Sequence, residues 1–237
     1  MLEHVPAWLG RALSGIRAGA DKLAIVQPEL GGRFDALDLS SPAFANEGRL
    51  PPRFTADGAG ISPPLVWGAT PEGTMMLALL VEDADAPAPQ PLVHAVVWGL
   101  PADAARLAEG AISADGTGSE ERGDVGRHSY FGEGWLPPDP PTGHGPHRYA
   151  FQLFALDASV EDPGPSPGRT ALMRAMAGHV LAAGLLIGTY SRGEEGRVEP
   201  VQATTAAAAL TYSSRAEELA SAATARAAER NMAISFR

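Results

Sequence analysis

The sequence predicts a mainly β fold, built as a sandwich of antiparallel sheets with a few peripheral helices. Three observations support this prediction. Long apolar stretches recur along the chain and end at acidic residues or prolines, as buried strands do. Glycine and proline separate these stretches, and only one convincing helical pattern interrupts them. With 45% hydrophobic residues, the chain also has enough apolar side chains to build a core.

Residues 1–38 are expected to form an amphipathic helical extension. Large apolar side chains recur at helical spacing between Pro6 and about Leu23, namely Trp8, Leu9, Leu13 and Ile16. We expect this helix to dock on the domain or on a second subunit. A helix lying on a membrane surface is the alternative, but its polar face has few basic residues.

Residues 39–192 are expected to form the main domain. Three apolar segments predict buried strands, at residues 74–82, 92–99 and 148–157. The last of these alternates strictly enough to present one wholly apolar face. The single helical pattern runs from Pro167 to Leu186, with Ser166 as the predicted N-cap.

Residues 193–237 are expected to be a charged linker followed by an alanine-rich helical tail. Ser214-Arg215-Ala216-Glu217 has the pattern of a capping box, which predicts a helix to about Arg230. The apolar face of this helix is thin, so we expect a partly ordered appendage or a contact between subunits.

The composition excludes several classes of function. A net charge of −10 argues against nucleic-acid binding, which needs clustered lysine and arginine. Without cysteine there is no disulfide, no thiol nucleophile and no thiolate metal ligand. No apolar run reaches membrane-spanning length, and the N-terminus shows no signal-peptide pattern. We therefore expect a cytoplasmic protein without a transmembrane segment.

Acidic and imidazole side chains gather in short motifs where predicted strands meet loops rich in proline and glycine. Asp83 and Asp85 follow one strand, His94 lies in the next, and His144 and His147 precede the third. Binding groups usually occupy loops held by a rigid sheet. The motifs therefore predict a single polar pocket.

These motifs resemble those of the phosphatidylethanolamine-binding protein family, and in particular its bacterial Raf kinase inhibitor-like branch. The resemblance runs from about Ser41 to Arg192. It rests on four boxes in the family's order: residues 62–67 with 71–74, Asp83-Ala84-Asp85-Ala86-Pro87, His94 with Trp98, and Gly145-Pro146-His147-Arg148-Tyr149. It implies a β-sandwich with a few peripheral helices, and a homodimer, because the bacterial relatives are often dimers.

The resemblance also implies a set of ligand-binding residues, namely Asp83, Asp85, His94, Pro140, Pro141, His147 and Tyr149. In the family, the first aspartate lines the pocket and the second holds its loop. Two positions apart on an extended chain, Asp83 and Asp85 are expected to point to the same side. Arg148 is expected to face away and form a structural salt bridge, and the peptide bond Gln90–Pro91 is expected to be cis.

The rim of the predicted pocket departs from the family pattern. Trp135 stands in place of a tyrosine, Pro137 in place of a glycine, and Asp139 adds a carboxylate near the expected anion position. Trp135, Asp139 and His144 are therefore candidate rim residues. For His144, a solvated loop histidine is the alternative interpretation.

We expect a non-catalytic module that binds a small phosphorylated ligand or a phospholipid head group. An imidazolium beside a carboxylate can donate hydrogen bonds to phosphoryl oxygens, and the carboxylate can accept them from an ammonium group. One alternative is an inhibitor that docks on a protein kinase or hydrolase. The other is a hydrolase or lyase that uses a histidine with Asp83 as acid and base. The spacing matches no metal-binding motif, so neither a metal nor a cofactor is predicted.

Overall fold

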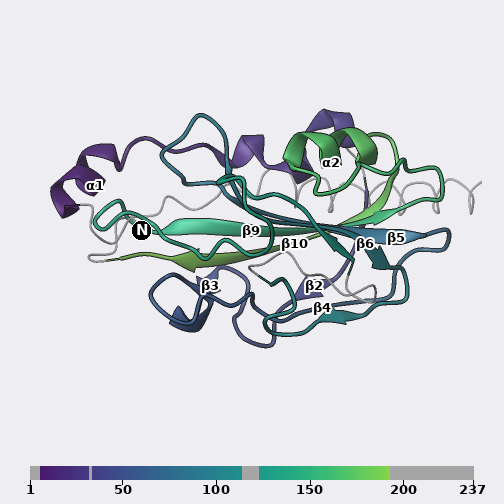
Figure 1. Cartoon of the computed structure of the whole chain (residues 1–237), viewed down its shortest axis with the longest axis horizontal. Helices are drawn as coiled ribbons and strands as arrows, with labels where there is room; N and C mark the ends of the chain where they lie inside the picture. Colours follow the sequence, from purple (N-terminus) through teal and green to yellow (C-terminus); the bar gives the residue numbers. More distant parts are fainter. Residues whose placement is uncertain (1–5, 32–33, 114–122, 193–237) are drawn as a thin grey trace, which may run out of the picture.

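The computed structural model describes residues 6–31, 34–113 and 123–192 and arranges them in three layers (Figure 1). A seven-stranded sheet forms the middle layer. A three-stranded sheet covers one of its faces, and the N-terminal segment with helix α2 covers the other. The predicted tail at residues 193–237, including its capping box at Ser214, lies outside the described residues.

The main sheet has the strand order β1-β10-β9-β5-β6-β8, and β3 pairs with β10 as well. Its strands are β1 (Asp35–Ala36), β3 (Gly48–Arg49), β5 (Met76–Asp83), β6 (Leu92–Pro101), β8 (Asp124–Val125), β9 (His147–Leu156) and β10 (Val180–Tyr190). The long strands pair antiparallel, as predicted, but β1 and β3 lie parallel to β10. The prediction of a mainly β sandwich is thus confirmed, with a mixed rather than purely antiparallel main sheet.

The predicted strands at residues 74–82, 92–99 and 148–157 are confirmed as β5, β6 and β9. Their side chains alternate between two hydrophobic cores, one on each face of the sheet. In β9, for example, Phe151 enters the core beneath the sheet and Phe154 the core above it. Burial on both faces explains why these strands are almost continuously apolar in sequence.

The smaller sheet consists of β2 (Leu39–Ser40), β4 (Leu65–Trp67) and β7 (Arg106–Leu107), all antiparallel. The short 3-10 helix η5 (Pro52–Phe54) lies in the same layer. Leu65, Trp67 and Leu107 turn inward and pack against the main sheet. The indole nitrogen of Trp67 donates to the carbonyl of Ala104 at 2.7 Å, so the ring is buried without losing its hydrogen bond.

The N-terminal segment crosses the opposite face of the main sheet as a short helix and three 3-10 turns. These are α1 (Ala7–Leu13), η2 (Ala20–Lys22), η3 (Ala24–Val26) and η4 (Pro28–Leu30). The predicted helix to Leu23 therefore ends ten residues early, at Leu13. Gly15 and Gly19 explain the early end, because glycine is a poor helix former and Gly19 adopts a φ of 104°.

A buried polar network fixes this segment to the sheet. The Glu82 carboxylate is fully buried and accepts hydrogen bonds from the amide N–H of Ala24 at 2.8 Å and from Gln152 Nε2 at 2.8 Å. It also pairs with Arg169 Nε at 2.6 Å. The Gln152 side-chain oxygen accepts from the N–H of Ile25 at 2.8 Å. The N-terminal segment thus docks on the chain's own domain and shares its core.

The predicted helix from Pro167 to Leu186 is only partly correct. Helix α2 (Arg169–Met176) occupies its first part, with Gly168 rather than Ser166 at the N-cap. Gly178 then takes a φ of 79°, which ends the helix, and the following apolar residues form β10 against β9. A short apolar run without polar interruptions fits a helix or a buried strand equally well by periodicity.

The predicted cis bond at Gln90–Pro91 is wrong, because the described residues contain no cis peptide bond. The trans form of a bond before proline is favoured by about 0.5–1 kcal/mol, and the structure keeps this default as the chain enters β6. None of the helices within the described ranges has the length and apolar character needed to cross a bilayer.

Candidate ligand pocket

A cavity of about 360 Å³ opens where β5 and β6 meet the loops that precede β9. Its volume falls at the lower end of the range for small-molecule sites. Helix α1 forms part of its wall. The described lining residues are mostly apolar, with a few polar groups: Leu9, Leu13, Asp83, Ala86, Pro87, Ala88, Leu92, His94, Tyr130, Leu136, Pro137, Asp139, Pro140, Pro141 and His147.

A chain of hydrogen bonds connects Asp83 to helix α1 through two buried histidines. His147 Nδ1 lies 2.7 Å from Asp83 Oδ2, and His147 Nε2 lies 2.7 Å from His144 Nδ1. His144 Nε2 in turn lies 2.9 Å from the carbonyl oxygen of Leu13 and 3.2 Å from that of Ile16. All four ring nitrogens of the two histidines therefore have partners within the protein.

The carbonyl acceptors at one end of this chain determine the tautomer of His144. The carbonyls at one end can only accept, so His144 Nε2 must carry a hydrogen, and His144 Nδ1 can accept one from His147 Nε2. His147 Nδ1 in turn faces Asp83 Oδ2, so both ring nitrogens of His147 are engaged within the protein.

Burial, with the nearby charges of His147 and Arg17, lowers the pKa of His144. His144 is therefore a neutral imidazole that donates from Nε2 and accepts at Nδ1. Because both nitrogens of His147 are engaged, this imidazole offers no free hydrogen-bond donor to a ligand. His147 thus lines the cavity, but its hydrogen bonds go to Asp83 and His144 and hold these side chains in position.

His94 is the histidine with a free nitrogen beside the cavity. Its Nδ1 donates to the carbonyl of Leu136 at 2.7 Å, while its buried Nε2 has no partner among the described residues. Burial lowers the pKa of His94, so the ring is neutral and Nε2 presents a lone pair. This atom is ready to accept a hydrogen bond from a ligand.

Tyr149 lies just beneath the cavity rather than on its wall. Its ring stacks on His147 with centroids 6.4 Å apart and meets His94 edge-on at 5.0 Å. The buried hydroxyl also has no partner within the described residues. Burial raises the pKa of Tyr149 well above its ordinary value, so the phenol keeps its proton. A buried hydroxyl without a partner costs about 1–3 kcal/mol.

Asp85 does not face the same side as Asp83, contrary to the expectation from their spacing. Strand β5 ends at Asp83 and the chain turns, with the Asp85 N–H donating to Asp83 Oδ1 at 2.8 Å. Asp85 is fully buried on the other face, where it pairs with Arg148 Nε at 2.6 Å and Arg17 Nη1 at 2.8 Å. The structural salt bridge predicted for Arg148 is confirmed.

Burial opposes ionisation of Asp85, but the hydrogen bonds and charges of Arg148 and Arg17 outweigh it and lower the pKa of this carboxyl. Asp85 also accepts the N–H of Arg148 at 2.9 Å. It therefore holds the turn after β5 in place without lining the cavity.

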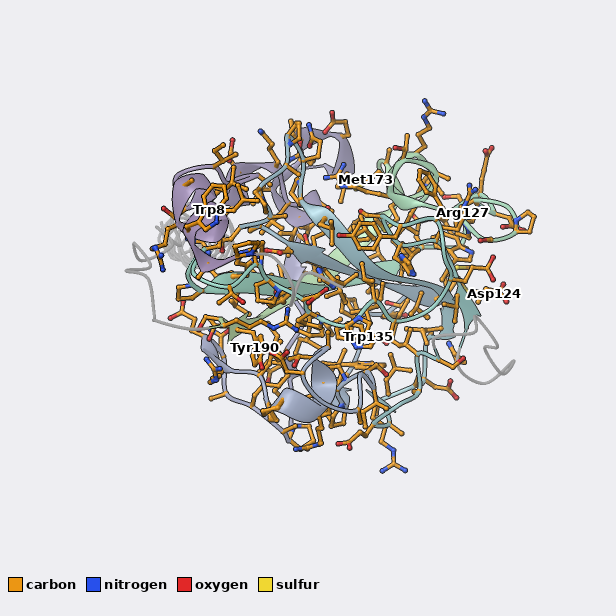
Figure 2. The ribbon with its side chains drawn as sticks, turned by 60° about the vertical axis from the view of Figure 1, so that its left-hand side comes forward. Trp8, Asp124, Arg127, Trp135, Met173 and Tyr190 are labelled. Carbon is orange, nitrogen blue, oxygen red and sulfur yellow. The ribbon has the colours of Figure 1, made fainter. Side chains whose placement is uncertain are left out.

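The candidate rim residues separate into different environments. Asp139 lines the cavity beside Pro140 and Pro141, and its carboxylate pairs with Arg192, which also pairs with Asp57. Trp135 lies in the core between the two sheets (Figure 2), with its Nε1 donating to the carbonyl of Phe54 at 3.2 Å. A large apolar ring with one satisfied donor is stable there.

Sequence reasoning missed the contribution of helix α1, whose Leu9 and Leu13 reach the cavity. Their helical spacing indicated a buried face, but spacing alone does not say what that face contacts. Leu136 and Tyr130 were missed as well, and no pattern in the sequence marks them. The described residues contain no group of three or more His, Asp or Glu side chains that could hold a metal ion.

The sandwich thus carries a partly open cavity at the ends of its central strands, as ligand-binding folds commonly do. The chain belongs to the phosphatidylethanolamine-binding protein family, because the family model of that description matches residues 40–191. A UPF0098 protein of Methanothermobacter thermautotrophicus is 40% identical over 158 residues, which cover 66% of this chain and 100% of that one. A UPF0098 protein of Aquifex aeolicus is 38% identical over 160 residues, covering 66% and 89%.

Solved structures agree with this assignment. A phosphatidylethanolamine-binding protein homologue from Chlamydia trachomatis superimposes with a TM-score of 0.59 at 32% identity, covering 67% of this chain and 99% of that one. YbcL of Escherichia coli, described as a member of the same family, gives a TM-score of 0.61 at 26% identity, covering 65% and 98%.

Proposed function

We propose that this protein is a non-catalytic module that binds a small phospholipid-type head group, with the ammonium end of the ligand entering the cavity first. The observation that carries the proposal is Nε2 of His94, a buried acceptor on the cavity wall that has no hydrogen-bond partner among the described residues. Buried polar atoms are normally hydrogen-bonded, and an ammonium group would complete this one. Membership of the family supports a ligand-binding role for the same region.

The electrostatics of the cavity favour a cationic end over a bare phosphate. No arginine or lysine occurs among the described lining residues, whereas Asp83 and Asp139 contribute two carboxyl groups to them. Two carboxylates, Asp57 and Asp139, share the single guanidinium of Arg192 nearby. Burial and the charges of Asp139 and Asp83 raise the pKa of Tyr130 at the cavity wall, as a negative local potential does.

A zwitterionic phosphoethanolamine group fits this arrangement. Its ammonium group would approach His94 and Asp83, and its phosphate would stay toward the mouth, where Tyr130 is half exposed. The described cavity wall offers no free charged donor to a bare phosphate. Both ring nitrogens of His147 are already hydrogen-bonded, one to Asp83 and the other to His144.

Binding is preferred over hydrolysis because the described part of the cavity wall has no serine, threonine or lysine to act as an activated nucleophile. His147 is also held on both sides, so it has no free nitrogen with which to activate a water molecule. The homodimer and the cytoplasmic location remain predictions from the sequence.

Calorimetric titration tests the proposal with ethanolamine, phosphoethanolamine and inorganic phosphate at pH 8, pH 6 and pH 5. We expect phosphoethanolamine to bind saturably at pH 8 and pH 6 and to bind no more tightly as the pH falls, because protonation of His94 would remove the acceptor. Binding should disappear in His94→Leu. It should survive in His179→Leu, because His179 contacts Asp157 and Ser159 rather than the cavity.

The opposite pH dependence would overturn the proposal. Phosphate that binds more tightly as the pH falls, with no contribution from the amine, would show an anion-first pocket. The absence of binding by all three compounds would reject a head-group site altogether.

A further inference from the structure

Helix α1 lies outside the residues that the family model matches, yet it forms part of the cavity. The match begins at residue 40, whereas α1 spans Ala7–Leu13. Leu9 and Leu13 nevertheless line the same cavity as Asp83 and His94. Helix α1 therefore adds a wall to the cavity from outside the matched residues.

The additional wall is held against the pocket by close backbone contacts. At Gly10, an added Cβ would lie only 2.1 Å from the carbonyl oxygen of Thr142, and at Gly143 it would lie 2.8 Å from that of Ala7. Glycine at these two positions lets the helix and the loop after Pro141 touch through their main chains. Helix α1 is thus seated directly on the loop that carries the proline wall of the cavity.

Side-chain hydrogen bonds secure the chain just after the helix. His144 Nε2 donates to the carbonyls of Leu13 and Ile16, which lie at and beyond the end of α1. Arg17 donates to the carbonyl of Pro146 at 3.0 Å and pairs with Asp85. The chain after α1 is therefore held by His144, which contacts His147 of the cavity wall, and by Asp85 in the turn after β5.

The wall that α1 contributes is entirely aliphatic. Its described lining residues are leucines, and Leu92, Leu136 and Ala88 extend the apolar lining of the same cavity. A polar head group would gain little from this surface. An aliphatic chain attached to the head group would bury its methylene groups there and gain affinity in proportion to the area removed from water.

We propose that α1 makes this pocket selective for an amphiphile, namely a donor-bearing head group that carries a short aliphatic chain. The inference rests on the proposed function, since the head group is the part bound by His94. Burial of about two methylene groups against the leucines corresponds to roughly a ten-fold gain in affinity.

The test compares phosphoethanolamine with its hexyl ester in calorimetric titrations of the full chain and of two glycine variants. Gly10→Ala forces a Cβ against Thr142 and displaces α1 from its seat. Gly15→Ala is the matched control, because nothing lies within 4 Å of its added Cβ. We expect the wild type and Gly15→Ala to bind the hexyl ester roughly ten-fold more tightly than phosphoethanolamine. Gly10→Ala should bind both compounds equally.

The outcomes separate this inference from the function on which it rests. If phosphoethanolamine binds and the hexyl chain adds nothing in the wild type, the amphiphile proposal fails while the head-group site stands. If neither compound binds, the head-group site itself fails. Should Gly10→Ala not fold, Leu13→Ala provides the same comparison, because it removes the aliphatic contact and keeps the main-chain seat of the helix. A hexyl gain that survives in both variants also overturns the role of α1.

Discussion

Replacement of Asp85 by asparagine removes one negative charge from a fully buried site and keeps its shape. In the native protein this carboxylate accepts the N–H of Arg148 at 2.9 Å, its Nε at 2.6 Å and its Nη2 at 2.7 Å, and also pairs with Arg17 at 2.8 Å. Two guanidinium groups lose their counter-charge in Asp85→Asn. Breaking a buried ion pair from one side costs about 3–5 kcal/mol, so we expect a loss of unfolding free energy of that size at pH 7.

The pH dependence of the loss follows from the lowered pKa of Asp85. A carboxyl whose folded pKa lies below its unfolded value stabilises the protein above the unfolded pKa, about 3.9, and loses that contribution as the pH falls through the folded pKa. Urea unfolding of both proteins between pH 7 and pH 3 should therefore show a difference that is largest at pH 7 and shrinks in acid.

A surface ion pair provides the control for this experiment. Arg53 and Glu109 pair at 3.2 Å with side chains 48% and 38% exposed. Glu109→Gln should change the unfolding free energy by less than about 1 kcal/mol, because solvent screens exposed pairs. The reasoning is refuted if Asp85→Asn behaves like Glu109→Gln at pH 7, or if its effect does not vary with pH.

Two further substitutions have outcomes that the structure makes specific. Tyr149→Phe removes a buried hydroxyl without a described partner, so thermal unfolding of the ligand-free protein should show unchanged or higher stability, by up to about 1 kcal/mol; a clear loss of stability would reveal a partner for that hydroxyl. Gly184→Ala places a Cβ 2.5 Å from the carbonyl oxygen of Leu37 and should cost about 1–3 kcal/mol in urea unfolding. Gly168→Ala meets nothing within 4 Å, and an equal loss in both variants would contradict this explanation.

The parts of the fold that were predicted correctly depend on local pattern. Strands β5, β6 and β9 are long, apolar and bounded by polar residues or proline, so their type could be inferred from composition along a short window. The run from Val180 to Tyr190 has the same character but follows directly on a helix. Whether it continued the helix or paired with β9 depended on a positive φ at Gly178, which a sequence does not reveal.

The pocket could be predicted in its residue types but not in its hydrogen bonds. Asp83, His94 and His147, whose motifs predicted a single pocket, line one cavity. They did not indicate that His144 would occupy the second nitrogen of His147, because this contact depends on the main-chain carbonyls of α1. Backbone carbonyls carry no side-chain signature, so their partners emerge only from the packing of distant segments.

The parallel edges of the main sheet have a consequence for the order in which the protein can fold. Asp35 in β1 pairs with Ala182 in β10, and Arg49 in β3 pairs with Thr189 of the same strand. During synthesis, β1 and β3 therefore remain unpaired until almost the whole domain has been made, because their partner β10 is the last of the described strands to leave the ribosome. Contacts so distant in sequence slow folding, and until β10 arrives the edge of β9 offers unpaired main-chain groups to other chains. The domain should thus complete its sheet only after β10 has been released. Nascent chains are most prone to aggregation in the period before β10 pairs with β9.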